Sequence, residues 1–329
     1  MIVNASAPVR LDFAGGWTDV APFAAERRGV VVNGAIGLRA MVTLELGGSG
    51  WRLESRDLGQ SITVDTADDL APNGTLDLLK AAVRLYGLGP CRLATRADAP
   101  PGSGLGTSGA VGVALVAACE AAAGRTPPPE ELAERAWQLE AVEAAVAGGR
   151  QDQYAAALGG FHRFEFGGAG VVPRGLTLPP GLGDQLAERL VVCYTGESRV
   201  SGNTISRVMG RYASGDEGVT GALEEMTIVA DTMALALEEG DVAALGRLLA
   251  RNWHLQQRLD DGMSTPAMAA LEAAVVAAGV LGGKAAGAGA GGTMFFLADR
   301  DHRAVTKAAR EAGATVLPLS WSSEGVRVW

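Results

Sequence analysis

Cysteine and histidine are both scarce in this chain of 329 residues, which contains three of each. Cys91, Cys119 and Cys193 lie far apart and are odd in number, so the sequence indicates neither a disulfide framework nor a zinc site. Widely spaced free cysteines suit a reducing compartment, and we expect a cytoplasmic protein. No run approaches the roughly 18 apolar residues of a membrane span, and the first residues, MIVNASAPVR, lack the charged-then-apolar pattern of a secretion signal.

Aromatic residues are also few, at 5% of the chain, although hydrophobic residues make up 48%. The core must therefore be built from Ala, Val and Leu, and the 46 glycines indicate many close backbone contacts. The net charge of −9 argues against bulk nucleic-acid binding, which needs a basic surface. We expect a small-molecule ligand, with neither nucleic acid nor membrane as a partner, and an oligomer is possible.

The most informative stretch is Pro100–Val116, which reads PPGSGLGTSGAVGVALV. A loop rich in proline and glycine passes there into a helix of small apolar residues, and Thr107 and Ser108 stand at the join, where a hydroxyl can cap the first turn. A helix start offers free N–H groups and a positive dipole end, and glycines let the backbone approach a ligand closely. The stretch predicts a loop that holds phosphate groups, with an ordinary strand-to-helix turn as the alternative.

Two well-known phosphate loops do not explain this stretch. The nucleotide loop G-x-x-x-x-G-K-[ST] is excluded because no lysine precedes Thr107 or Ser108. The dinucleotide pattern G-x-G-x-x-G matches at Gly104, Gly106 and Gly109, but it requires a second strand that ends in an acidic residue about 20 positions later. The chain instead continues as an alanine-rich helix into three prolines, which argues against a nicotinamide enzyme.

Periodicity predicts an α+β protein. Strands are expected at residues 2–14, 30–36, 39–46, 51–56, 61–65, 91–97, 161–166, 190–194, 293–298, 315–319 and 326–329. Helices are expected at 22–28, 76–86, from 107 to about 125, 129–147, 150–158, 203–212, 219–239, 242–259, 266–278 and 302–312. We expect the domain boundary near residues 181–187, which divides the chain into residues 1–183 and 184–329.

Four polar residues are candidates for catalysis or ligand binding, and each also has an ordinary structural explanation. Arg10 could simply form a surface ion pair with Asp12, and an aspartate in a glycine turn, such as Asp19, is usually a turn former. Asp152 at a helix start could be a cap, or a base whose ionised form the helix dipole favours. Glu140 would be a solvated residue unless it partners a hydroxyl, since one carboxylate and one hydroxyl are typical of a Mg²⁺ site.

Three segments taken together resemble the motifs of the GHMP kinases, which include galactokinase, homoserine kinase and mevalonate kinase. PVRLDFAGGWTD at 8–19 resembles their first motif, PPGSGLGTSGA at 100–110 their second, and GGKAAGAGAGG at 282–292 their third. The resemblance spans nearly the whole chain in the family's order. It implies an N-terminal domain with a ribosomal-protein-like βαβ unit, a ferredoxin-like C-terminal domain, and ATP bound between them.

Within this family, GGRQDQYAAALGG at 148–160 is similar to the branch of heptose-phosphate kinases. That likeness implies a catalytic carboxylate at Asp152, a basic residue near the transferred phosphoryl group at Arg10, and Mg²⁺ held by Ser108 and Glu140. ATP would contact the second motif, and the sugar the first motif and Arg150. The implied nucleotide-binding residues are Pro101, Gly102, Ser103, Gly104, Leu105, Gly106, Thr107 and Ser108, and the implied sugar-binding residues are Gly16, Trp17, Thr18, Asp19 and Arg150.

Some positions depart from the family pattern. Thr107 stands where serine is usual, Gly109 where alanine is usual, and Ala290 interrupts the glycine run of the third motif. Trp17 is closer to the Gly-Gly-Trp-Ser-Asp of fucokinases than to the Gly-Gly-Gly-Thr-Asp of heptose kinases. We therefore expect phosphorylation of a sugar hydroxyl, first of all the anomeric hydroxyl of D-glycero-D-manno-heptose 7-phosphate. The alternatives are a kinase for an unphosphorylated sugar, such as L-fucose or galactose, and a non-catalytic sugar sensor.

A phosphorylated sugar would need a basic pocket that a free sugar does not. The sequence offers four candidates for its lining, and it does not say which of them converge: Arg27, Arg28, Arg150 and Arg199.

Overall fold

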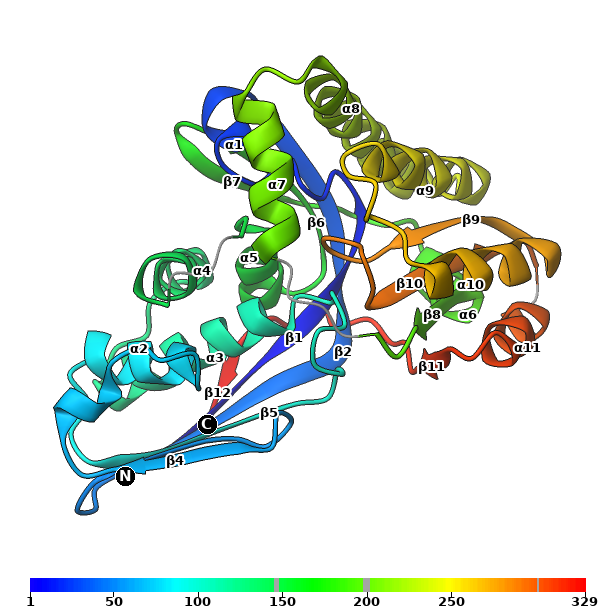
Figure 1. Ribbon diagram of the computed structural model, residues 1–329. Helices are drawn as coiled ribbons and strands as arrows, with labels where there is room; N and C mark the ends of the chain where they lie inside the picture. Colours follow the sequence, from blue (N-terminus) through cyan, green and yellow to red (C-terminus); the bar gives the residue numbers. More distant parts are fainter. Residues whose placement is uncertain (145–147, 198–201, 301) are drawn as a thin grey trace.

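The computed structural model describes residues 1–144, 148–197, 202–300 and 302–329, which fold around two β-sheets (Figure 1). The strands of the larger sheet are β1 (Ile2–Ala14), β2 (Gly29–Leu46), β3 (Trp51–Ser55), β4 (Gln60–Val64), β5 (Cys91–Ala97), β6 (Phe161–Gly167), β7 (Gly170–Gly175) and β12 (Arg327–Val328). Their order is β12-β1-β2-β5-β3-β4, and β6 and β7 extend the sheet from β2. β1 and β2 therefore form its centre.

Strand β1 is buried on both faces. Val9, Leu11 and Phe13 lie in the hydrophobic core, as their alternation predicts, but Arg10 and Asp12 on the opposite face are also buried. Helices cover both sides of the sheet, which explains this burial. The polar residues of β1 thus point into the protein and need partners there.

Strand β2 is one long strand, whereas the sequence predicts two. Its register with β1 shifts between Pro8 and Val9, where Gly37 and Leu38 stand opposite no partner. The irregularity bends the strand without ending it. Because of its length, β2 pairs with β6 through its first half and with β5 through its second half.

The helices on the larger sheet lie in two layers. The short α1 (Phe23–Glu26) follows the first turn, and α2 (Asp77–Leu85), α3 (Thr107–Ala122), α4 (Pro129–Gln138) and α5 (Gln151–Leu158) come later in the chain. α3 and α5 pack on β1 and β2, and α8 (Glu217–Glu239) also packs on both strands (Figure 1). α3 is buried almost all round, which accounts for its composition of Ala, Gly and Val.

The segment after α4 differs from the predicted helix. A continuous α-helix was expected from residue 129 to about 147, but α4 ends at Gln138 and a π-helical turn spans Leu139–Glu143. The expected end of the helix at 145–147 lies outside the described residues. π-helical turns occur frequently at functional sites, and this one carries Glu140.

The smaller sheet contains β8 (Leu190–Tyr194), β9 (Val280–Ala285), β10 (Thr293–Ala298) and β11 (Thr315–Leu317), in the order β11-β8-β10-β9 with antiparallel neighbours. In chain order this is 4-1-3-2, the arrangement of a ferredoxin-like sheet, which confirms that expectation. The remaining helices are α6 (Leu182–Arg189), α7 (Gly202–Ala213), α9 (Val242–Gln257), α10 (Pro266–Ala277) and α11 (His302–Glu311). In the part of the chain described, no helix is long and apolar enough to cross a membrane.

The two halves of the sequence are interwoven at the C-terminal end. β12 pairs with β1, and Asn4 and Trp329 exchange two backbone hydrogen bonds of 3.0 Å, so the last residues complete the larger sheet (Figure 1). The predicted boundary between residues 183 and 184 falls inside α6, a helix that the sequence did not reveal. It remains a prediction.

Candidate active site

Arg10 and Asp152 meet where β1 faces the start of α5. The Arg10 guanidinium donates from Nε and Nη2 to Asp152 Oδ1, at 2.8 and 2.6 Å. Arg10 is 3% exposed, whereas the Asp152 side chain is 30% exposed. Burial lowers the pKa of Arg10, but the charges of Asp152 and Asp12 raise it more, so the pKa lies above its ordinary value. Arg10 is thus a buried, permanent positive charge next to a carboxylate that is partly exposed to solvent.

The loop of the second motif lies directly against this pair. Gly102, Gly104 and Gly106 all have positive φ, between 67° and 78°, which explains why glycine recurs at every second position. A Cβ on Gly106 would lie 3.1 Å from Asp152 Cγ and 3.4 Å from Arg10 Cζ. Arg10 Nη1 also donates to the Gly104 carbonyl at 2.7 Å. The backbone of the loop thus reaches the charged pair with no side chain between them.

The start of α3 corrects one prediction. A hydroxyl of Thr107 or Ser108 was expected to cap the helix, but the N-cap is Gly106 in the left-handed conformation and no side chain in the described residues bonds to the first turn. The reason is that Ser108 Oγ donates to Glu140 instead, and that Thr107 is already inside the helix. The first N–H groups of α3 are left without a side-chain cap, as an anion site requires.

Ser108 and Glu140, which are 32 positions apart in the sequence, are in contact through the short hydrogen bond from Ser108 Oγ to Glu140 Oε1. Gln153 Nε2 donates to the other carboxylate oxygen at 2.6 Å. Burial raises the pKa of Glu140 above its ordinary value, and the hydrogen bond from Ser108 opposes that shift. The contact brings a carboxylate and a hydroxyl to the start of α3, one turn of helix from the loop.

Asp19 is held by the residue that precedes Asp152. Its carboxylate accepts hydrogen bonds from the backbone N–H and from Nε2 of Gln151, both at 3.1 Å. Burial raises the pKa of Asp19 to about 6, although the backbone hydrogen bond from Gln151 lowers it. Gln151 Oε1 is buried and has no partner among the described residues. The Asp19–Gln151 pair therefore has a buried acceptor without a partner in the described residues, on the residue that precedes Asp152.

The other predicted sugar-binding residues have different surroundings. Trp17 is 3% exposed, belongs to the hydrophobic core, and has a φ of +87°, which is strained for a tryptophan. Thr18 Oγ1 donates within its own turn, at 2.8 Å from the Gly15 carbonyl. Arg150 stacks on Trp137, with its Cζ 4.0 Å from the ring centre, and lies at the N-cap of α5. Gly16 is buried beside Asp12.

The four candidate arginines for a sugar phosphate do not all converge. Arg27 pairs with Glu224, and Arg28 with Glu165 and Asp231, so both have carboxylate partners on α8 or β6. Arg199 lies outside the described residues. Arg150 is the one of the four that adjoins Gln151 and Asp152 in the chain, and it forms an ion pair with Glu134 at 3.5 Å.

The third glycine-rich segment spans residues 282–292. It begins as strand β9, and its loop packs on the second motif: a Cβ on Gly287 would lie 2.6 Å from the Gly104 carbonyl oxygen. Thr293 donates from its backbone N–H to the Ser103 carbonyl at 2.9 Å. These glycines therefore let the third segment pack closely against the loop of the second motif, and its contacts hold that loop in place.

Sequence reasoning missed two residues that join these segments. Lys284 of the third motif is fully buried, and its Nζ donates to Asp12 Oδ2 at 2.8 Å. Asp12 Oδ1 accepts the backbone N–H of Gly287 at 2.9 Å. Burial lowers the pKa of Lys284, and the charge of Asp12 opposes that shift. Arg10 and Asp12 do form an ion pair, at 3.9 Å, but the alternative that places this pair on the surface is wrong, because both residues are buried.

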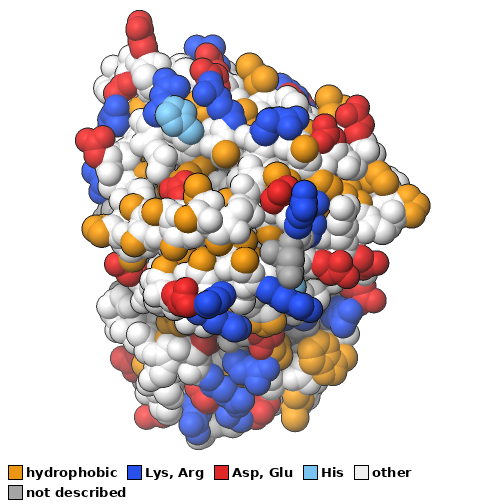
Figure 2. Space-filling model, turned by 90° about the vertical axis from the view of Figure 1, so that its right-hand side faces the viewer, with side chains coloured by type: hydrophobic (Ala, Val, Ile, Leu, Met, Phe, Trp, Pro, Cys, Tyr) orange, Lys and Arg blue, Asp and Glu red, His pale blue; other side chains and the backbone are white. Residues whose placement is uncertain are grey.

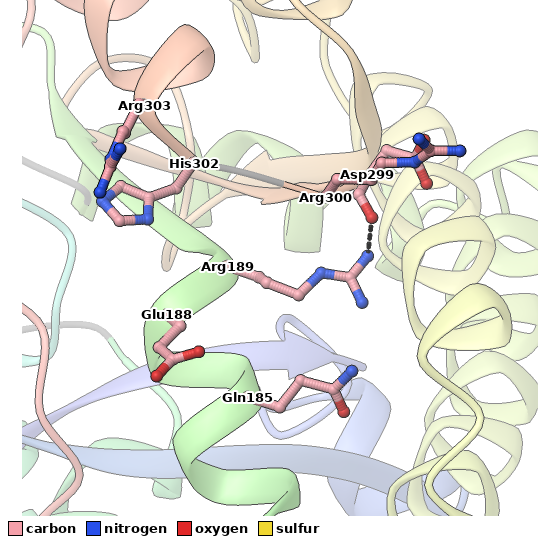
Figure 3. A pocket seen from close by; sticks show the side chains of 7 residues that line it. All are labelled: Gln185, Glu188, Arg189, Asp299, Arg300, His302 and Arg303. Atoms are coloured by element: carbon pink, nitrogen blue, oxygen red, sulfur yellow. Dashed lines mark hydrogen bonds between the residues drawn. The ribbon is translucent and has the colours of Figure 1, made fainter.

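A cavity of about 690 Å³ lies away from these groups, between α6 and the turn from β10 to α11 (Figure 3). Arg189 crosses it and donates to the backbone carbonyl of Asp299. None of the predicted site residues lines it; the lining residues are Gln185, Glu188, Arg189, Asp299, Arg300, His302 and Arg303. On the side of the molecule shown in Figure 2, basic side chains lie interspersed with acidic ones.

A glycine loop at an uncapped helix start that lies against a buried arginine and its carboxylate partner favours the binding and transfer of a phosphate group. The family model of the GHMP kinases N terminal domain matches residues 73–160, and that of the GHMP kinases C terminal matches residues 233–315. The chain belongs to the GHMP kinase family. It is an ATP-dependent kinase whose acceptor is a hydroxyl group.

Several relatives match along the whole chain. A D-glycero-alpha-D-manno-heptose 7-phosphate kinase of Campylobacter jejuni is 29% identical over 99% of this chain and 98% of its own. An L-fucokinase/L-fucose-1-P guanylyltransferase of Bacteroides fragilis is 28% identical over 99% of this chain but only 38% of its own. The crystal structure of a D-glycero-D-manno-heptose 1-phosphate kinase from Bacteroides thetaiotaomicron has a TM-score of 0.81 at 26% identity, covering 99% of this chain and 98% of that one.

Proposed function

We propose that this kinase transfers a phosphoryl group from ATP to the anomeric hydroxyl of D-glycero-D-manno-heptose 7-phosphate. The observation that carries the proposal is the junction of the first two motifs with α5, where Arg10, Asp152 and the Gly102–Gly106 loop meet. The choice of a heptose phosphate is supported by the full-length similarity to the Campylobacter jejuni relative.

Asp152 is the group that acts on the acceptor hydroxyl. Its carboxylate is partly exposed, and Arg10 binds one of its oxygens, Oδ1. The other oxygen can accept the hydroxyl proton or orient that hydroxyl toward the phosphorus. Because phosphoryl transfer demands mainly positioning and charge stabilisation, the fixed positive charge of Arg10 serves both the carboxylate and the transferred group.

The triphosphate would lie on the second motif. The uncapped N–H groups at the start of α3 and the left-handed glycines before it give a concave backbone surface for phosphate oxygens. Residues Pro101 to Ser108 form this surface, and the third segment holds it in place through Gly287 and Thr293.

Ser108 and Glu140 fit a Mg²⁺ ion. One hydroxyl and one carboxylate oxygen in contact are the hard oxygen ligands that this ion prefers while it keeps several waters. When bound, the ion would neutralise negative charge on the phosphate oxygens. Gln153 would keep the carboxylate oriented, since it donates to the oxygen that Ser108 leaves free.

The sugar would lie beside the first motif and the start of α5. Asp19 and Gln151 together offer acceptors for sugar hydroxyls, while Gly16 leaves space and Thr18 fixes the turn. Trp17 would contribute through its edge, because its indole N–H is buried and finds no partner within the described residues. We assign the phosphate at position 7 of the sugar to Arg150, which is half-buried next to Gln151.

A panel of acceptors tests the proposal. The protein is given ATP and Mg²⁺ with the heptose 7-phosphate, the unphosphorylated heptose, L-fucose or galactose, and the release of ADP is measured; ³¹P NMR then locates the new phosphate. We expect turnover with the heptose 7-phosphate and a product phosphorylated at the anomeric carbon. Turnover with L-fucose or galactose alone would favour the free-sugar kinase, and sugar binding without ADP release the sugar sensor.

The variant Arg150→Met separates the two kinds of kinase further. Loss of the guanidinium removes a charge-assisted hydrogen bond to a phosphate, which is worth about 1.5–3 kcal/mol, so KM for the phosphorylated sugar rises on the order of 10- to 100-fold. KM for ATP stays unchanged. Arg27→Met is the matched control, since that arginine is exposed and paired with Glu224. Equal effects of both variants would contradict the assignment.

We also propose a cytoplasmic location, in which ATP is available. It is supported by Cys91, Cys119 and Cys193, which are all free and buried.

A further inference from the structure

We infer that Lys284 and Asp12 are positioning residues that hold Arg10 in its catalytic orientation. This inference rests on the proposed function, in which Arg10 and Asp152 act on the acceptor hydroxyl and the transferred group. Neither Lys284 nor Asp12 contacts Asp152. They act on it through Arg10.

Both carboxylate oxygens of Asp12 accept hydrogen bonds. Its Oδ2 accepts Lys284 Nζ at 2.8 Å, and its Oδ1 accepts the Gly287 N–H at 2.9 Å. Lys284 Nζ donates in addition to the backbone carbonyls of Asp12 and Ala285, at 2.8 and 2.7 Å, which accounts for its three protons. Lysine and aspartate are 0% and 1% exposed, so water cannot replace either partner.

Arg10 stands between two carboxylates, and its position depends on their balance. It donates to Asp152 from Nε and Nη2 and to the Gly104 carbonyl from Nη1, while Asp12 Oδ1 lies 3.9 Å from the same Nη1. As long as Lys284 and Gly287 occupy Asp12, Nη1 remains free for the Gly104 carbonyl. Arg10 therefore points toward Asp152 because Lys284 already neutralises the charge of the Asp12 carboxylate.

Removal of Lys284 would leave the Asp12 carboxylate buried with one N–H donor. An uncompensated buried charge is strongly unfavourable, and Arg10 is the nearest cation that can move toward it. The guanidinium would then leave the Gly104 carbonyl and turn away from Asp152, while Gly287 and Thr293 still hold the loop that would bind phosphate. A misplacement of about 1 Å can cost on the order of 100-fold in rate, so the effect falls on kcat rather than on the binding of either substrate.

The test compares Lys284→Met with Lys80→Met. Lys80 is also buried, at 1% exposure, but its partners are the Ala71 carbonyl, Asn73 Oδ1 and Asp77, none of which is a proposed catalytic group. Both variants lose a buried ammonium group, so both melt at lower temperature. We expect only Lys284→Met to lower kcat, on the order of 10- to 100-fold, with KM for ATP and sugar changed less than about twofold. Equal kcat values in folded Lys284→Met and wild type would overturn the inference.

The double variant Asp12→Asn/Lys284→Met keeps the inference testable if Lys284→Met alone does not fold. It removes both charges of the pair, so no unpaired charge is left in the interior. If Lys284 acts through Asp12, the double variant has the kcat of Asp12→Asn alone. A loss equal to the product of the two single losses would mean that the residues act independently, and the inference would fail.

A crystal structure of Lys284→Met provides a readout that needs no substrate. We expect Arg10 Nη1 to have moved from the Gly104 carbonyl to Asp12, whereas in Lys80→Met it remains in place. An unmoved Arg10 refutes the positioning role whatever the acceptor is. A wild-type protein that phosphorylates no sugar, together with a displaced Arg10 in the variant, would refute the proposed function and leave the positioning inference standing.

Discussion

Asp19→Asn should make the protein more stable and a poorer enzyme at the same time. Burial raises the pKa of Asp19 from 3.8 to about 6 in the folded protein. Between these two pH values the folded state holds a proton that the unfolded chain has released, so stability falls as pH rises through this window and is constant above it. The shift corresponds to about 3 kcal/mol at pH 8.

Asparagine removes this charge and can keep the local hydrogen bonds. Its Oδ1 can accept from the Gln151 backbone N–H, and its Nδ2 can donate to Gln151 Oε1, which is buried and unpartnered in the described structure, once the glutamine amide turns over. Relative to wild type, the variant should therefore gain about 1 kcal/mol between pH 5 and pH 6, and reach its full advantage of up to about 3 kcal/mol above pH 7.

Urea unfolding at pH 5, 6, 7 and 8 measures this difference, with Asp68→Asn, an exposed aspartate, as the control for loss of one negative charge. In the same protein, KM for the sugar should rise on the order of 10- to 100-fold, since a charged acceptor for a hydroxyl is worth about 1.5–3 kcal/mol. A variant that is less stable than wild type by the same amount at every pH would refute the reasoning, because burial of the charge would then cost nothing.

Four further substitutions test the remaining assignments. Asp152→Asn should leave nucleotide affinity intact and lower kcat by roughly 10²–10⁴; unchanged turnover would reduce Asp152 to a helix-start residue. Ser108→Ala and Glu140→Ala should each raise the Mg²⁺ concentration needed for half-maximal rate, and the double variant should lose less than the two effects combined, since both bind one ion; strict additivity would count against a shared ion. Trp17→Gly should raise KM for the sugar several-fold without changing KM for ATP, whereas a lower melting temperature alone would show that the ring only packs.

Elements with strong local patterns were predictable from the sequence. The strands at 2–14, 91–97, 190–194 and 293–298 have the predicted bounds, because apolar alternation or a short apolar run ends there at glycine, proline or a charged residue. β7 and α6 were missed. Gly170–Gly175 has glycine at both ends and Pro173 inside, and α6 follows two prolines and a glycine and is half polar, so both lack the composition of a typical strand or helix.

The sequence predicted the residues of the candidate site that stand in motifs, but not the buried contacts that connect them. Arg10, Ser108 and Asp152 stand in motifs, Glu140 stands on the helix predicted at 129–147, and the structure brings the four together in two contacting pairs. No local pattern could show that Lys284 meets Asp12, because the two residues are 272 positions apart. Buried ion pairs of this kind depend on how two sheets pack, and sequence periodicity carries no information about that packing.

The strand β12 has a consequence for how the protein is made. A ribosome that adds about 5–20 residues per second needs roughly 15–60 s to reach residues 327–328 after β1 has been synthesised. Throughout that time the β12 side of β1 presents an unpaired edge, and the end of α5 lacks the segment at Gly325, which packs against the Ala157 carbonyl. The larger sheet can close, and the helix that carries Asp152 can pack fully, only after residues 325–328 have been synthesised. A nascent chain stalled shortly before residue 320 should thus expose an unpaired strand edge that is prone to aggregation, and chaperones should bind it.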